Sequence, residues 1–116
     1  MTPEEVAAAP SVRRWFDSAR LHSDTEDEKR LRYGLLGDFC EHVGQTPDEL
    51  VAGLIRTTKA GETAISGKRR TAMDASIDEF VEKSGFGGRD AIVNGNIIRS
   101  FLVHNGIFIQ GRVWRG

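Results

Sequence analysis

Apolar residues recur three and four positions apart through most of this chain, and that spacing places them on one face of an α-helix. The longest such stripe consists of Leu31, Leu35, Leu36, Phe39, Cys40 and Val43. Gly44 follows it directly, and glycine is the residue that most often ends a helix. No run of strands accompanies the helical segments, so the sequence predicts an all-α fold, a small bundle of four to five helices.

Capping residues mark where the helices of the first half begin. Thr2-Pro3-Glu4-Glu5 and Thr46-Pro47-Asp48-Glu49 each have the form of a capping box, with proline at the first helical position. Ser11 is expected to cap another helix, and Ser23 or Asp24 is expected to cap the long helix that carries the apolar stripe. These signals predict four helical segments before residue 56.

The second half contains one stretch with little pattern. Residues 57–72 are predicted to form a loop or a frayed entry to a helix. Helical spacing returns from Met73 to Lys83. A last helix is predicted from about Asp90 to His104, and Asn105-Gly106 would end it.

Length and charge limit the chain to one ordinary domain that is not a simple polybasic protein. It has 116 residues and a formal charge of -1. The charge is uneven, because residues 1–60 carry 8 basic and 11 acidic groups whereas residues 61–116 carry 8 and 6. We therefore expect an anionic partner to dock on the C-terminal part of the chain.

Composition also indicates a compartment. Cys40 is the single cysteine, so no internal disulfide can form, and this fits a reducing environment. No window approaches the roughly 18 apolar residues of a membrane span, and the acidic start lacks the basic residues of a secretory signal. We expect a cytoplasmic protein that makes no membrane contact.

The sequence indicates no catalytic or metal site. A catalytic base or nucleophile needs a positioned partner, and no partner is evident for the candidates Cys40, Tyr33, His22, His42 and His104. Cys40 lies on the apolar stripe, where a thiol is usually inert. The histidines lack the i, i+4 spacing of a zinc helix. We expect a protein that is not an enzyme and has no cofactor, no metal and no small-molecule substrate.

Nucleic-acid binding has more support, most of it from the last predicted helix. With Phe101 at the buried centre, a helical wheel places Asn96 and Arg99 together on the outer side. Arginine and asparagine carry the paired donors and acceptors that match guanine and adenine edges in the major groove. An ordinary solvated face is the alternative interpretation of the same two residues.

Other basic residues are candidates for contacts with phosphates. Lys68, Arg69 and Arg70 form a compact cluster, and Arg30 points away from the apolar stripe of the long helix. Such contacts would hold a nucleic acid without reading its sequence. A three-residue cluster is also common on surfaces that only contact water.

The order and spacing of several segments resemble the N-terminal core-binding domain of tyrosine recombinases, closest to archaeal-type integrases. The resemblance covers roughly residues 12–107. The segments are Val12-Arg13-Arg14-Trp15, the helix with Tyr33, Leu36 and Phe39, Thr46-Pro47-Asp48-Glu49-Leu50, Phe80-Val81, Arg99-Ser100-Phe101-Leu102 and His104-Asn105-Gly106-Ile107.

This resemblance implies a SAM-like helical bundle that forms one half of a C-shaped clamp around double-stranded DNA. The catalytic residues of the family belong to a separate C-terminal domain, so Tyr33 would not be the nucleophile. The last helix would enter a groove and carry Asn96 and Arg99. Arg89 and Lys59 would contact the DNA backbone at helix ends, and other recombinase protomers are possible partners.

The resemblance also suggests how the chain is divided. Residues 1–22 would be an N-terminal helical extension, residues 23–107 the core-binding domain, and residues 108–116 the start of a connection to a catalytic domain. The expected function is a non-catalytic DNA-binding domain that clamps an integrase on its attachment site. The alternative is a helical protein-interaction or dimerisation module that uses exposed Ile92 and Val103 and does not touch DNA.

Overall fold

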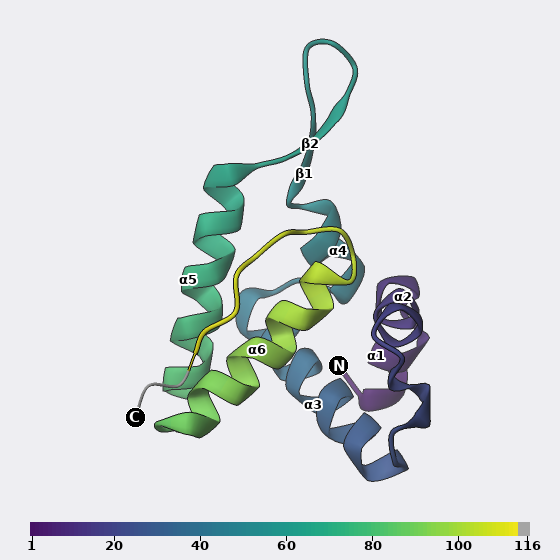
Figure 1. The fold of residues 1–116 in the computed structure, drawn as a ribbon, viewed down its shortest axis with the longest axis vertical. Coiled ribbons are helices and arrows are strands. Elements are labelled where there is room, and N and C mark those ends of the chain that lie inside the picture. Colours follow the sequence, from purple (N-terminus) through teal and green to yellow (C-terminus); the bar gives the residue numbers. More distant parts are fainter. Residues whose placement is uncertain (114–116) are drawn as a thin grey trace.

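The computed structural model describes residues 1–113, which fold mainly into helices (Figure 1). The helices are α1 (Pro3–Ala8), α2 (Pro10–Ser18), the 3-10 turn η1 (Leu21–Ser23), α3 (Glu26–Val43), α4 (Pro47–Ala52), α5 (Gly67–Lys83) and α6 (Arg89–Val103). Strands β1 (Ile55–Thr57) and β2 (Thr63–Ile65) form a hairpin between α4 and α5. The prediction of a helical domain is confirmed, with a hairpin that it lacked. Within the described residues, no helix combines the length and hydropathy needed to cross a membrane.

The predicted helix starts agree with the structure at both capping boxes and deviate slightly elsewhere. Thr2 and Thr46 each accept a hydrogen bond from the backbone three residues on, and the glutamate there bonds back. The cap of α3 is Thr25, one residue after the predicted Asp24. Helix α2 begins after Ala9, so Ser11 is not its cap but a buried residue of its first turn.

The hairpin corrects the prediction for residues 57–72. Ile55 pairs with Ile65 and Thr57 with Thr63 in antiparallel register, and α5 begins at Gly67. Strands of three residues are too short to show an alternating pattern, so periodicity could not reveal them. Their β-branched cross-strand pairs nevertheless favour the extended backbone.

One hydrophobic core joins all six α-helices. Trp15, Phe16, Phe39 and Phe101 are its largest fully buried side chains. Val6 and the two aromatic residues of α2 lie in this same cluster, so the segment predicted as an N-terminal extension packs with α3 and α6. The burial of the apolar side chains of this core is the main favourable contribution to the stability of the domain.

The chain reverses after α6 and runs back as an extended segment between α5 and α6 (Figure 1). We call residues 107–112 the C-terminal segment. Gly106 makes the reversal with a φ of 86°, which glycine adopts without strain. Ile107 and Ile109 are buried and belong to the core. Part of the predicted connection at residues 108–116 therefore packs on the domain, and its residues 114–116 lie outside the described part of the chain.

Candidate nucleic-acid interface

Arg99, predicted to face outward from α6, is buried, and that prediction was wrong. Its side chain is 2% exposed. Its Nε donates a hydrogen bond to Oδ1 of Asp74, and its Nη2 donates to Oδ1 of Asp78, both at 2.8 Å. Nη2 of Arg112 donates to the second oxygen of each carboxylate, at 2.6 and 3.1 Å. These four residues form an ion-pair network that joins α5, α6 and the C-terminal segment.

The network contains equal numbers of positive and negative groups, and its hydrogen bonds favour the ionised form of Asp74 and of Arg112. Burial opposes ionisation of Asp74, but hydrogen bonds from Arg112 and Arg99 outweigh it and hold the pKa of Asp74 below its ordinary value. The hydrogen bond to Asp74 in turn raises the pKa of Arg112. Because two guanidinium groups face two carboxylates, the network offers no free positive charge to an anion. Base reading by Arg99 is therefore not compatible with this structure.

Asn96 also has a structural role in place of the predicted outward one. Its Nδ2 donates to the carbonyl oxygen of Arg112 at 2.7 Å, and its Oδ1 accepts from the backbone nitrogen of Arg112 at 2.8 Å. The amide thus pairs with the C-terminal segment as a neighbouring strand would. Both groups that would recognise adenine are occupied.

The helical wheel of α6 failed because this helix is covered on two sides. One side packs against α2 and α3, and the other faces α5 and the C-terminal segment. Gly95 allows this close packing, since a Cβ there would lie 2.8 Å from Nη1 of Arg99 and 3.6 Å from Cγ2 of Ile77. Of the two apolar residues predicted to be exposed, Val103 is exposed but Ile92 is half-buried.

A second group of cations, unlike this network, has no carboxylate partner in residues 1–113. It covers the hairpin and the first turn of α5, and we call it the basic cluster. Its members are Arg56, Lys59, Lys68, Arg69 and Arg70. Glu62 is the only acidic residue from 55 to 71, and no ion pair among the described residues includes a member of the cluster. The hairpin that carries two of these cations projects from one end of the molecule (Figure 1).

The structure fixes the hairpin to the start of α5. The backbone nitrogen of Ser66 donates to the carbonyl oxygen of Leu54 at 2.8 Å. Nη1 of Arg69 donates to the carbonyl oxygen of Gly53 at 3.0 Å, just before the hairpin. These bonds hold the two parts of the basic cluster in a defined relation, which reduces the entropic cost of binding a ligand to both.

Three of the cations lie where a helix disfavours positive charge. Lys68, Arg69 and Arg70 occupy the first turn of α5, which contains no acidic residue. The first turn of α3, by contrast, holds three acidic residues. A cation at the positive end of the helix dipole costs about 0.3–1 kcal/mol, so a bound anion would relieve an unfavourable arrangement.

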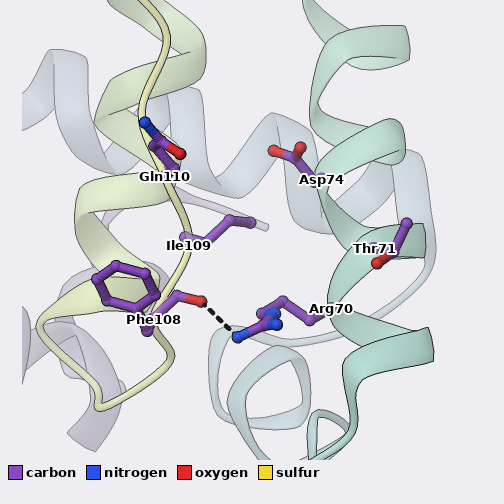
Figure 2. A pocket seen from close by; sticks show the side chains of 6 residues that line it. All are labelled: Arg70, Thr71, Asp74, Phe108, Ile109 and Gln110. Atoms are coloured by element: carbon purple, nitrogen blue, oxygen red, sulfur yellow. Dashed lines mark hydrogen bonds between the residues drawn. The ribbon is translucent and has the colours of Figure 1, made fainter.

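Arg70, like Arg69, also supports the fold through a side-chain hydrogen bond. Its Nη1 donates to the carbonyl oxygen of Phe108 at 3.3 Å, across a hollow between α5 and the C-terminal segment (Figure 2). Asp74 lines the same hollow from one turn further along α5. Arg56, Lys59 and Lys68 are exposed instead, and no hydrogen bond of their side chains is found among the described residues.

The structure brings together only part of the predicted site. Lys59, Lys68, Arg69 and Arg70 belong to the basic cluster, which adds Arg56, a residue that sequence reasoning missed because β1 was not predicted. Arg30 and Arg89 are exposed, but they lie in the first halves of α3 and α6. Both helices begin at the end of the molecule opposite the hairpin (Figure 1). Neither residue is part of the cluster.

Two histidines form side-chain pairs that the sequence did not predict. His22 Nε2 lies 2.5 Å from Oδ1 of Asp17, and His104 Nδ1 lies 2.7 Å from the hydroxyl of Ser18. Both pairs are exposed, and in residues 1–113 no third side chain is hydrogen-bonded to either ring. The same residues contain no group of three or more metal-ligating side chains.

Comparison of the chain with protein-family models, with curated proteins and with solved structures gave no match. The family resemblance of the sequence therefore stays a prediction.

Proposed function

We propose that this chain is a non-catalytic domain that binds double-stranded DNA, of the SAM-like kind found in tyrosine recombinases. The observation that supports the proposal best is the basic cluster, five cations that no carboxylate of the described residues neutralises. Phosphate contacts depend on such cations and supply most of the affinity of non-specific binding. The proposal keeps the clamp role implied by the sequence resemblance and moves the DNA contacts from α6 to the hairpin and the start of α5.

The first test is a titration of a fluorescently labelled 30-base-pair duplex at two salt concentrations. An isolated half of a clamp should bind in the non-specific range of about 10⁻⁴ to 10⁻⁶ M at physiological salt. If four or five cations contact phosphates, the slope of log K against log salt should be about -4. No binding at low salt, or binding that does not change with salt, would contradict the proposal.

The four lysines of the chain provide a matched control for position. Lys59 and Lys68 belong to the basic cluster, whereas Lys29 and Lys83 form surface ion pairs with Glu26 and Glu79. Lys59→Gln/Lys68→Gln should reduce the salt slope by about 2, because each lost phosphate contact removes about 0.9. Lys29→Gln/Lys83→Gln changes the net charge equally and should leave the slope unchanged. Equal effects of both variants would show that overall charge, not the cluster, controls binding.

The alternative, a protein-interaction module, depends on exposed apolar side chains near the end of α6. Val103 is 42% exposed and Phe108 is 73% exposed. Isolated apolar residues are common on monomer surfaces, so we favour the DNA-binding proposal. A molecular mass that rises with protein concentration, together with no DNA binding, would favour the alternative.

A further inference from the structure

We infer that the β1–β2 hairpin enters the major groove of duplex DNA and that Arg56 reads guanine there, an inference that rests on the proposed function. The hairpin would then replace α6 as the base-reading element. The argument uses the dimensions of the hairpin, the direction of its side chains and its fixed attachment to α5.

The dimensions of the hairpin fit the major groove. Two paired strands lie about 4.8 Å apart, and the major groove of B-DNA, about 12 Å wide, admits a two-stranded ribbon. Strand β1 rises by about 7 Å from Ile55 to Thr57 at 3.4 Å per residue, and the turn after it extends the hairpin further, so the ribbon is at least comparable in length to the groove depth of about 8.5 Å. With the ribbon lying in the groove, the face that carries Arg56 can approach base edges while the start of α5 remains at the phosphates. The minor groove is only about 6 Å wide and would exclude it.

The register of the strands separates the two faces of the hairpin. Ile55, Thr57, Thr63 and Ile65 share one face, because paired residues project to the same side. Ile65 packs against the core from this face. Arg56 pairs with Ala64 on the other face, where the small alanine side chain leaves the guanidinium uncovered. Arginine bonds to the O6 and N7 atoms of guanine with two donors, the most frequent specific contact in the major groove.

The hairpin is closed by its own hydrogen bonds. The backbone nitrogen of Thr58 donates to the carbonyl oxygen of Glu62 at 2.7 Å, and that of Gly61 donates to the carbonyl oxygen of Thr58 at 2.9 Å. The backbone nitrogen of Glu62 also donates to the hydroxyl of Thr58, at 3.2 Å. The turn therefore presents Lys59 in a defined position, and little order must be gained on binding.

The basic residues at the start of α5 complete the footprint. Lys68 lies at the base of the hairpin and is exposed, at a place suited to the phosphates that border the groove. The geometry also favours DNA over double-stranded RNA, whose major groove is deep and too narrow for side chains to read. A DNA duplex should therefore bind more tightly than an RNA duplex of the same sequence.

The experiment begins with duplexes that the complete chain selects from a random DNA pool. A selected duplex is then made with guanine or with 7-deazaguanine, which lacks the N7 acceptor in the major groove but pairs normally. Wild-type protein should lose affinity by about fivefold or more on the modified duplex, as expected for one bidentate contact. Arg56→Gln should bind the two duplexes equally, and Arg13→Gln, an exposed arginine on α2, should behave as wild type.

The outcomes separate this inference from the proposed function. If no duplex binds at low salt, the proposed function fails. If duplexes bind with the expected salt dependence but neither 7-deazaguanine nor Arg56→Gln changes the affinity, the hairpin does not read guanine and only this inference fails. Displacement of the protein by a minor-groove-binding drug would overturn the assignment of the groove.

Discussion

The guanidinium of Arg99 on α6 hydrogen-bonds at 2.8 Å to the carboxylate of Asp74 on α5, a residue 25 positions earlier in the sequence. Asp78 and Arg112 complete the network. A buried cation with two carboxylates contributes less through attraction than its loss would cost, because removing one partner leaves the others desolvated and unpaired. Because Arg99 is held in this network, its role is to stabilise the packing of α6 against α5.

Replacing Arg99 should affect folding more than binding. Arg99→Ala removes the buried cation and leaves Asp74 and Asp78 with Arg112 alone, so the free energy of unfolding should fall by about 3 kcal/mol. Denaturant unfolding followed by circular dichroism measures this change. Arg13→Gln, on the exposed side of α2, should leave stability nearly unchanged. A stable Arg99→Ala protein with altered sequence preference would restore α6 as the base-reading element.

The sequence predicted local features well and failed where distant segments meet. The capping boxes at Thr2 and Thr46, the end of α3 at Gly44 and the extent of α6 depend on neighbouring residues, and the structure confirms them. The burial of Arg99 depends on two carboxylates one turn apart on another helix, Asp74 and Asp78. A helical wheel contains no such information.

The same reasoning explains the two remaining differences between the prediction and the structure, which are the second covered side of α6 and the hairpin. A wheel assumes one buried side, but α6 is covered a second time by a segment that follows it, in which Ile107 and Ile109 are buried. The hairpin was missed because each strand has three residues. As a result Lys68, Arg69 and Arg70 were recognised as a cluster, while Arg56 was not connected to them.

Acid should weaken the network at a pH set by Asp74. The pKa of Asp74 is lower in the folded state, so its contribution to stability is complete above the unfolded pKa of about 3.9 and is lost as pH falls through the folded pKa. The difference in unfolding free energy between wild type and Asp74→Asn should therefore be constant from pH 7 to pH 5 and shrink below about pH 4. Urea unfolding at each pH measures it. A difference as large at pH 3 as at pH 7 would show that ionised Asp74 is not the source.

Two glycines inside helices should respond oppositely to the same substitution. At Gly34 in α3 an added Cβ meets no neighbouring atom of residues 1–113 within 4 Å, so Gly34→Ala should stabilise the protein by about 0.5–1 kcal/mol through helix propensity. At Gly95 in α6 the Cβ would collide with Nη1 of Arg99, which two carboxylates hold in place. Disturbing these pairs costs about 3 kcal/mol or more, which exceeds the propensity gain of about 1 kcal/mol.

Thermal or urea unfolding of the two alanine variants, side by side with wild type, tests this contrast. Stabilisation by both substitutions would mean that Arg99 moves aside at little cost. A gain at Gly34 would also show that close packing does not require glycine there, since no other part of the described chain approaches that position closely. Gly37, by contrast, lies against Val6 of α1, with 3.2 Å between an added Cβ and Cγ2 of that residue.

The thiol of Cys40 should be chemically silent in the folded protein. It is 1% exposed, and burial raises its pKa to about 12, so at pH 8 almost no thiolate is present and reagents cannot reach it. Modification should therefore require opening of the core around α3, and its rate should rise with urea as the unfolded population rises. Reaction with a chromogenic disulfide reagent at pH 8 measures the rate, and protein in concentrated guanidinium, where the thiol is fully accessible, provides the reference. Rapid labelling without denaturant would mean that α3 opens far more readily than the packing of Leu36, Phe39 and Cys40 implies.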